Sequence, residues 1–273
     1  MMTSKPVRLG AVDYLNARPL VYGLELHSAR FSLRFDVPSK CAALLHEGSI
    51  DVGMIPSVEY MRGHEDYCIV PDLAIVSEGP VASVALFTSR PPAKIRTIAA
   101  DTSSRTSNAL LQILCHETFG VEADFVPMSP DPRAMLQACD AALLIGDNAL
   151  FFDHAGAGLE KIDLGAEWTR LTALPFVWAF WAGRSRVLSP AHVSDLIEAR
   201  DHGVRSSDAI ADEYCGPERA TTGRAYLREH IRYSLGEREH AGLQRYYELA
   251  VRHGLIEVMR PLMWYHVADL KPR

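Results

Sequence analysis

The 273-residue sequence lacks the features of several large classes of protein. It contains no long basic run, and its formal net charge is −6, whereas a dedicated nucleic-acid-binding protein usually carries a basic patch. No apolar stretch approaches the length of a membrane span, and the N-terminal residues include no apolar segment of signal-peptide length. We therefore expect a cytoplasmic protein whose partners are neither nucleic acid nor membrane.

Disulfide and cofactor patterns are also missing. The five cysteines are scattered, odd in number and form no C-x-x-C pair, which is typical of reduced thiols rather than of a disulfide framework. Neither the phosphate-binding motif G-x-x-x-x-G-K-[ST] nor the zinc-binding motif H-E-x-x-H occurs. We predict that the protein uses no metal and no nucleotide cofactor.

The sequence does contain an alternation of strand and helix patterns. Residues 7–12, 31–37 and 50–55 have the apolar patterns of strands. Between the last two, residues 38–48 are typical of a helix that begins at Pro38 and ends at a glycine. Apolar spacing also predicts a helix over residues 18–26. This order indicates a parallel sheet with crossover helices.

Two longer apolar strands, residues 81–89 and 175–182, enclose a second α/β unit. An inserted unit between two long strands predicts an α/β protein of two lobes, with the two strands crossing between them as a hinge. We expect one lobe to comprise residues 1–88 and 178–273, and the other residues 89–177. The cleft between such lobes is the expected ligand site.

Asn16 lies in the loop that follows the first predicted strand. In an open α/β sheet, ligands bind outside the carboxyl ends of the strands. The asparagine amide can donate and accept a hydrogen bond at once, which suits a hydroxyl or a carboxylate of a ligand. The alternative is an Asx-turn, in which Asn16 bonds only its own backbone.

A hydroxyl-rich loop, residues 101–107, follows a strand of the second unit and begins a helix. The free N–H groups and the dipole of a helix start attract an anion, and a carboxylate fits this site well. Ser and Thr are also the preferred capping residues, so a plain capped helix is the alternative. Five hydroxyl residues in six positions favour ligand binding over capping alone.

Three other polar residues are expected near the cleft. Asp147 follows the predicted strand that ends at Gly146, a residue that permits a tight turn, and it is either a cleft carboxylate or, as its residue type favours, a helix N-cap. Ser57 is also more typical of an N-cap. Ser83 lies on the first crossing strand, where its hydroxyl would face the cleft.

Several ordered motifs resemble those of the chorismate dehydratases, which act in the futalosine route to menaquinone. They are Y-L-N-x-x-P-L, I-P-S-V-E-Y, the serine of the first crossing strand, D-x-S-S-x-T-S, I-G-D-x-A-L and L-P-F-V-x-A-x-W, and together they run from Val7 to Trp181. The related dihydroxynaphthoate synthases begin instead with a P-N-D-T-like loop, which is absent here.

The resemblance implies a type II periplasmic-binding-protein-like fold and a hydro-lyase. The family removes water from chorismate to leave 3-[(1-carboxyvinyl)oxy]benzoate, without metal or organic cofactor. The implied catalytic residues are Asn16, Ser83 and Asp147, although the base is either Asp147 or the substrate's own enolpyruvyl carboxylate. The expected substrate-binding residues are Arg18, Ser57, Ser103, Ser104, Arg105, Thr106, Ser107, Gly146 and Asn148.

Other functions fit the same predicted fold. A solute-binding protein of a transporter would hold a small anion without chemistry, and fold alone does not distinguish it from an enzyme. The effector-binding domain of a regulator would accompany a DNA-binding helix-turn-helix, for which the sequence before the first strand leaves no room. The dihydroxynaphthoate synthase reaction is the third alternative.

Overall fold

The first sheet is built around β1, the predicted strand at the start of the chain. In the computed structural model, which describes residues 5–266, this sheet has five strands in the order β2-β1-β3-β10-β4. β1 runs parallel to β2 and β3, whereas β10 runs antiparallel to both β3 and β4. The sheet is therefore mixed rather than all parallel. Its strands are β1 (Val7–Val12), β2 (Phe31–Asp36), β3 (Val52–Pro56), β4 (Tyr67–Ser77) and β10 (Phe176–Arg184).

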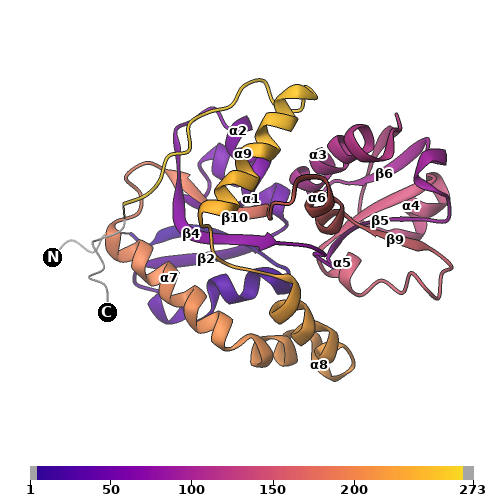
Figure 1. The fold of residues 1–273 in the computed structure, drawn as a ribbon. Helices are drawn as coiled ribbons and strands as arrows, with labels where there is room; N and C mark the ends of the chain where they lie inside the picture. The colour runs from indigo at the N-terminus through magenta and orange to yellow at the C-terminus, as the bar shows by residue number, and fades with distance from the viewer. Residues whose placement is uncertain (1–4, 267–273) are drawn as a thin grey trace.

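The second sheet lies in the part of the chain between β4 and β10, as the predicted insertion requires. Its strand order is β7-β6-β8-β5-β9, with β6 parallel to β7 and β8 and with β5 antiparallel to β8 and β9. Figure 1 shows the two sheets side by side, each with its own helices. The strands are β5 (Val84–Thr88), β6 (Thr97–Asp101), β7 (Asp124–Met128), β8 (Ala141–Ile145) and β9 (Glu160–Asp163).

The helices cover both sheets, and several begin or end where the sequence predicts. α1 starts at Pro38 and ends at Gly48, whose φ of 78° is readily adopted by glycine. In Figure 1, α9 lies above the first sheet and α7 below it. The helices are α1 (Pro38–Glu47), α2 (Ser57–Arg62), α3 (Arg105–Leu114), α4 (Pro132–Ala138), α5 (Gly146–Leu150), α6 (Leu164–Thr172), α7 (Pro190–Arg205), α8 (Ser207–Ala225) and α9 (Glu237–Arg252).

The chain passes between the two sheets through residues 78–83 and 173–175. β5 pairs residue for residue with β8, and β10 pairs with β4 from Phe176 onward. β5 therefore lies wholly within the second sheet, and β10 lies wholly within the first. The chain changes sheet a few residues before each of the predicted boundaries at 88/89 and 177/178. The division of the chain into lobes at those residues stays a prediction.

The predicted helix over residues 18–26 is wrong in type. The chain instead forms two 3₁₀ segments, η1 (Leu15–Val21) and η2 (Leu24–His27). Pro19 lies inside η1, and proline supplies no N–H for an α-helical hydrogen bond. Several elements, among them β4, β9 and α6, had no prediction. β4 is an edge strand that contains Pro71, and Asp72 has a φ of 56°, so its pattern is interrupted.

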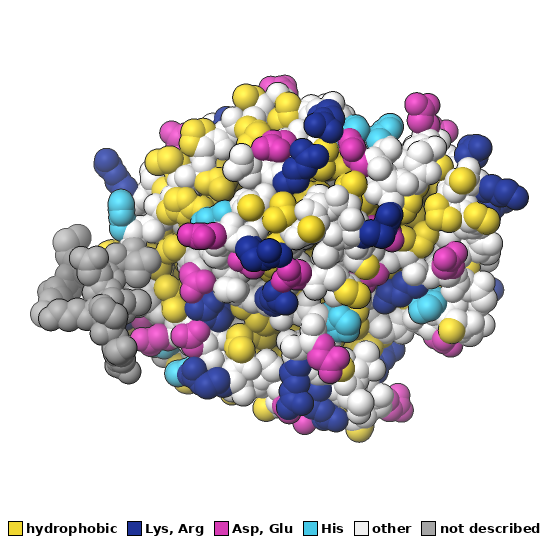
Figure 2. Space-filling view, viewed as in Figure 1, with side chains coloured by type: hydrophobic (Ala, Val, Ile, Leu, Met, Phe, Trp, Pro, Cys, Tyr) yellow, Lys and Arg dark blue, Asp and Glu magenta, His cyan; other side chains and the backbone are white. Residues whose placement is uncertain are grey.

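Surface charge on the face of the molecule drawn in Figure 2 is mixed. Basic and acidic side chains are interspersed over this face, and neither sign forms a large continuous patch there. Across residues 5–266, no helix is both long enough and apolar enough to cross a lipid bilayer.

η1, which carries Asn16, is held in place by a close approach of α7. A Cβ atom at Gly203 of α7 would lie only 2.1 Å from the carbonyl oxygen of Pro19. We expect Gly203→Ala to lower the free energy of unfolding by about 2 kcal/mol, because an added methyl forces the two backbones apart. Urea unfolding measures this. The neighbouring Val204→Ala, at an exposed position, is the control, and an equal loss in both variants would contradict the close approach.

Candidate active site

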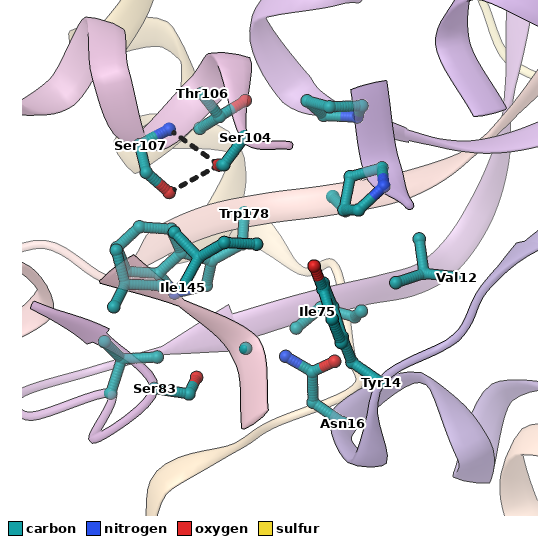
Figure 3. A pocket seen from close by; sticks show the side chains of 16 residues that line it. Val12, Tyr14, Asn16, Ile75, Ser83, Ser104, Thr106, Ser107, Ile145 and Trp178 are labelled. Atoms are coloured by element: carbon teal, nitrogen blue, oxygen red, sulfur yellow. Dashed lines mark hydrogen bonds between the residues drawn. The ribbon is translucent and has the colours of Figure 1, made fainter. Parts of the chain in front are cut away.

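A cavity lies between the two lobes at the carboxyl ends of β1, β6 and β8. Polar groups occupy two opposite sides of it, with Ser104 and Ser107 on one side and Asn16 and Ser83 on the other (Figure 3). Apolar side chains line the cavity between these two sides. The lining residues are Val12, Tyr14, Asn16, Pro38, Pro56, Ile75, Val81, Ser83, Val84, Ser104, Thr106, Ser107, Ile145, Gly146, Trp178 and Ala179.

Asn16 projects from η1 into the cavity, as predicted from its position after β1. The hydroxyl of Tyr233 donates a hydrogen bond to the Asn16 carbonyl at 2.9 Å and fixes the backbone. The side-chain Oδ1 is buried and has no hydrogen-bond partner among residues 5–266. A buried acceptor without a partner is costly, so this atom is suited to a ligand donor.

Ser83 lies directly before β5, and its side chain is fully buried at the edge of the cavity. Its hydroxyl is 2.6 Å from that of Tyr226. Burial raises the pKa of Tyr226, while hydrogen bonding from Ser83 and the Asn16 amide lowers it only in part. The Tyr226 hydroxyl therefore stays protonated and links the two predicted catalytic residues.

The hydroxyl-rich loop both caps a helix and lines the cavity. Ser104 is the N-cap of α3, accepting from the Ser107 N–H at 3.3 Å and donating to the Ser107 hydroxyl at 2.7 Å. The capping alternative is thus correct for Ser104. Both hydroxyls also line the cavity, so the start of the ten-residue helix α3 and the positive end of its dipole face the cavity.

Ser103 and Thr106 stabilise this loop instead of facing the ligand space with free hydroxyls. The Ser103 hydroxyl donates to Asp101 at 2.6 Å, and Ser103 does not line the cavity. The Thr106 hydroxyl accepts from the Val58 N–H at 3.2 Å, across the lobes. Thr106 does line the cavity, but this contact directs its hydroxyl toward the start of α2.

Tyr14 is a cavity residue that sequence reasoning missed. Its ring lies against Gly146, where a Cβ atom would come within 2.9 Å of the ring carbons, and the φ of Gly146 is 59°. Glycine is therefore required here for both reasons. Burial raises the pKa of Tyr14 to about 12, and its hydroxyl is 3.4 Å from Ser103 Oγ. The sequence signals were the position of Tyr14 two residues after β1 and its place at the start of the motif Y-L-N-x-x-P-L.

The apolar middle of the cavity was also not predicted. Trp178 of β10 lines it, and its indole N–H donates to Ser77 Oγ at 3.0 Å, so the polar edge of the ring is satisfied away from the ligand space. Ile75 and Ile145 complete the apolar surface. An apolar gap between two polar sides suits a ring that carries polar groups at its ends.

Two predicted binding residues lie away from the cavity. The guanidinium of Arg18 pairs with Asp13 and stacks on Phe35 and Tyr214 at 4.8 and 4.9 Å. Asn148 is an exposed residue of α5. Neither lines the cavity. Arginine can stack on aromatic rings while it pairs with a carboxylate, which accounts for the place of Arg18.

Ser57 and Arg105 also differ from their expected roles. Ser57 is not an N-cap; its hydroxyl donates to the Val177 carbonyl at 2.8 Å and is fully buried. Arg105 forms an ion pair with Glu59 of α2, and it does not line the cavity. Both contacts join segments far apart in the sequence, so local patterns could not reveal them.

Asp147 is neither a helix N-cap nor a residue that lines the cavity. Its two oxygens accept hydrogen bonds from the Leu15 N–H at 3.2 Å and the Tyr214 hydroxyl at 2.5 Å. Burial raises the pKa of its carboxyl group, and these two donors oppose the rise only in part. Gly146, the preceding residue and itself a predicted substrate-binding residue, does line the cavity.

Glu59 connects the lobes on the other side of the cavity. Its side chain is 2% exposed and contacts Arg105 of α3, Arg62 at 3.2 Å and His46 at 3.5 Å. Burial raises the pKa of Glu59, but the hydrogen bond from His46 and the charges of both arginines outweigh it, so the pKa lies below its usual range. The start of α3 is thereby tied to the first lobe.

Within residues 5–266, no group of three or more His, Cys, Asp or Glu side chains could hold a metal ion. The cavity instead offers hydroxyls, an amide and a helix start, which are groups that recognise an anion by hydrogen bonding.

Two α/β lobes with a cavity between them define the class of periplasmic-binding-protein-like folds. The periplasmic aliphatic sulphonate binding protein SsuA from Escherichia coli superposes with a TM-score of 0.65 over 99% of this chain and 96% of its own, at 16% identity. At this identity the likeness shows the fold alone.

Within this class, the chain belongs to the menaquinone biosynthesis family, whose model matches residues 7–252. A chorismate dehydratase from Thermus thermophilus is 30% identical over 267 residues, covering 89% of this chain and 95% of that protein. A chorismate dehydratase from Campylobacter jejuni is 31% identical over 176 residues, covering 62% and 64%. The predicted fold and family are confirmed.

We expect Glu59→Gln to lower the free energy of unfolding by about 2 kcal/mol near neutral pH, because Arg62, Arg105 and His46 all lose the carboxylate that they contact. The folded-state pKa of Glu59 lies below its usual value of 4.5, so its contribution to stability is present above pH 4.5 and is lost as the pH falls through the folded pKa. The difference between the two proteins should shrink in acid.

Urea unfolding of both proteins near neutral pH and well below pH 4.5 measures this change. The control is Glu167→Gln, which removes an ion pair with Arg170 in which both side chains are more exposed than Glu59. This variant should change stability little. A loss in Glu59→Gln that stays constant or grows in acid would show that the Glu59 carboxylate does not stabilise the fold.

Proposed function

We propose that this protein is a chorismate dehydratase, which converts chorismate to 3-[(1-carboxyvinyl)oxy]benzoate and water. Family membership and the chorismate dehydratase from Thermus thermophilus support this proposal. The observation that carries it is the cavity itself, in which Ser104 and Ser107 face Asn16 and Ser83 across an apolar gap. Chorismate is a ring with carboxylates and a hydroxyl at its edges, and it matches that arrangement.

The reaction breaks two bonds on neighbouring ring carbons. A base takes the proton from the carbon that bears the enolpyruvyl ether, and the C–O bond to the hydroxyl on the next carbon breaks. The hydroxyl leaves with a proton as water, and the electrons of the C–H bond complete an aromatic ring. The overall driving force is therefore intrinsic, and the acidity of the C–H group limits the rate.

The hydroxyl loop is suited to lower this barrier. The ring carboxylate is conjugated to the carbon that loses its proton, so negative charge spreads onto it as a dienolate. The Ser107 hydroxyl, which accepts from Ser104, and the free N–H groups at the start of α3 can donate to this carboxylate. Donors fixed in advance stabilise the transition state more than the ground state, because the charge on the carboxylate grows during proton loss.

Asn16 is suited to the departing hydroxyl. Its Oδ1 has no donor among the described residues, and the substrate hydroxyl supplies one, whereas a carboxylate would not. The amide NH₂ can donate to the same oxygen as the C–O bond breaks. Ser83, held by Tyr226, would fix the ring from the same side.

The substrate's own enolpyruvyl carboxylate is the base that the geometry favours. Asp147 does not line the cavity, and both of its oxygens already accept hydrogen bonds. A carboxylate within the substrate needs only to be positioned, and good positioning is worth several orders of magnitude in rate. On this mechanism the enzyme is a carbon–oxygen lyase. The lack of a cofactor and the cytoplasmic location stay predictions.

Incubation of the purified protein with chorismate, without metal or cofactor, tests the function. We expect a benzoate product lighter than chorismate by one water, detected by mass and by ultraviolet absorbance. Unchanged chorismate together with a raised melting temperature would indicate a binding protein without chemistry. The absence of both turnover and a melting shift would exclude chorismate as the ligand.

Asn16→Ala should lower kcat about 10²-fold, the usual loss when one preorganised donor is removed. Asn16→Asp should be impaired as strongly, because a carboxylate cannot donate to the departing oxygen. Steady-state kinetics with chorismate measures both variants. Gln244→Ala, an exposed α9 substitution, is the control. Full activity of Asn16→Ala would show that the amide takes no part in the reaction.

A further inference from the structure

Asp147 joins the two lobes through a single carboxylate. It lies on α5, directly after β8 of the second sheet. Its two hydrogen-bond donors, the Leu15 N–H and the Tyr214 hydroxyl, belong to η1 and α8 of the other lobe. Separation of the lobes at this point therefore removes both bonds to the carboxylate at once.

This contact lies beside the cavity. Leu15 directly precedes Asn16, and Gly146 directly precedes Asp147; Asn16 and Gly146 both line the ligand space. The bond from the Leu15 N–H thus fixes the peptide between Tyr14 and Leu15, one residue before Asn16, and with it the backbone from which the Asn16 side chain projects. A shift of this peptide would move the Asn16 amide away from the departing hydroxyl.

Tyr214 is itself held in place on its other side. The Arg18 guanidinium lies over its ring at 4.9 Å and over the Phe35 ring at 4.8 Å, and Arg18 pairs with Asp13. Burial raises the pKa of Tyr214, and so does its hydrogen bond to Asp147, so the hydroxyl stays protonated and donates. Arg18 therefore orients the donor of this contact.

The carboxylate of Asp147 carries a cost in stability. Burial raises its pKa, so the charged form is less favourable in the folded chain than in the unfolded chain near neutral pH. A buried charge maintained at a cost, at the edge of a cavity, indicates a role other than stability.

We propose that Asp147 and Tyr214 are positioning residues for the dehydration, which act through the Leu15 N–H to hold Asn16 in the cavity when the lobes are together. The proposal rests on the proposed function, since it assigns a place to Asn16 in that reaction. It differs from the role of a base, because neither oxygen of Asp147 exchanges a proton with the substrate.

The two roles predict opposite effects of Asp147→Asn. Asparagine keeps an oxygen that accepts from the Leu15 N–H, and its NH₂ group can donate to a Tyr214 hydroxyl turned to accept. A positioning residue is therefore rescued by asparagine, whereas a base is not. We expect Asp147→Asn to keep kcat within about fivefold of the wild type, and Asp147→Ala to lose about 10²-fold, as misplacement of a catalytic group does.

Tyr214→Phe removes one of the two bonds, so we expect an intermediate loss in kcat of about tenfold. In Asp147→Ala and Tyr214→Phe, KM should change less than kcat, because Asn16 is displaced while Ser107 and the start of α3 still bind the carboxylate. Steady-state kinetics with chorismate measures kcat and KM separately. Tyr22→Phe and Asp212→Ala alter more exposed groups away from the cavity and are the matched controls.

Small-angle X-ray scattering of the substrate-free proteins supplies a readout that needs no activity. Asp147→Ala and Tyr214→Phe should show a larger radius of gyration than the wild type, and Asp147→Asn the wild-type value. This separates the two proposals: if the wild type leaves chorismate unchanged, the proposed function fails, while the scattering still tests the contact between the lobes.

Loss of activity in Asp147→Asn equal to that in Asp147→Ala would overturn the proposal and make Asp147 a base. Wild-type kcat and radius of gyration in Tyr214→Phe would also overturn it. Circular dichroism and melting temperature establish that each variant is folded. If Asp147→Ala does not fold, Asp147→Asn and Tyr214→Phe decide the outcome.

Discussion

Two carboxylates, the buried Glu59 and the partly buried Asp147, connect the lobes of this protein on the two sides of the cavity. Glu59 of the first lobe binds Arg105 of the second, and Asp147 of the second binds Leu15 and Tyr214 of the first. Removing a carboxylate from water is costly, and its hydrogen-bond partners offset that cost only while the lobes are together. Separation would rehydrate both groups.

The cavity combines an apolar middle with polar ends. Trp178 and the isoleucines make the middle apolar, and a hydrogen bond in such apolar surroundings is stronger than in water. The start of α3 supplies one end without any charged side chain, because free N–H groups and a helix dipole suffice for a carboxylate. This arrangement explains how an acidic protein can hold a substrate of the same sign.

Several polar residues were assigned to the ligand from sequence but are used by the protein itself. Ser57 bonds Val177, 120 residues away, and Arg105 pairs with Glu59, 46 residues away. A hydroxyl or guanidinium has the same appearance in a sequence whether a ligand or a distant backbone satisfies it. Tyr14 was missed for the converse reason, since only its contact with Gly146 across the lobes brings it to the cavity.

The sequence by itself determined most of the strands and helices, the inserted second unit, the family, and the loops that reach the cavity. These features follow from periodicity, from Pro38 and Gly48 at the ends of α1, and from short motifs, all of which act between near neighbours in the chain. Only the tertiary structure decided which side chain within each loop faces the ligand. That choice depends on hydrogen-bond partners and packing contributed by remote segments, such as Tyr214 for Asp147 and Tyr226 for Ser83, and no local pattern encodes them.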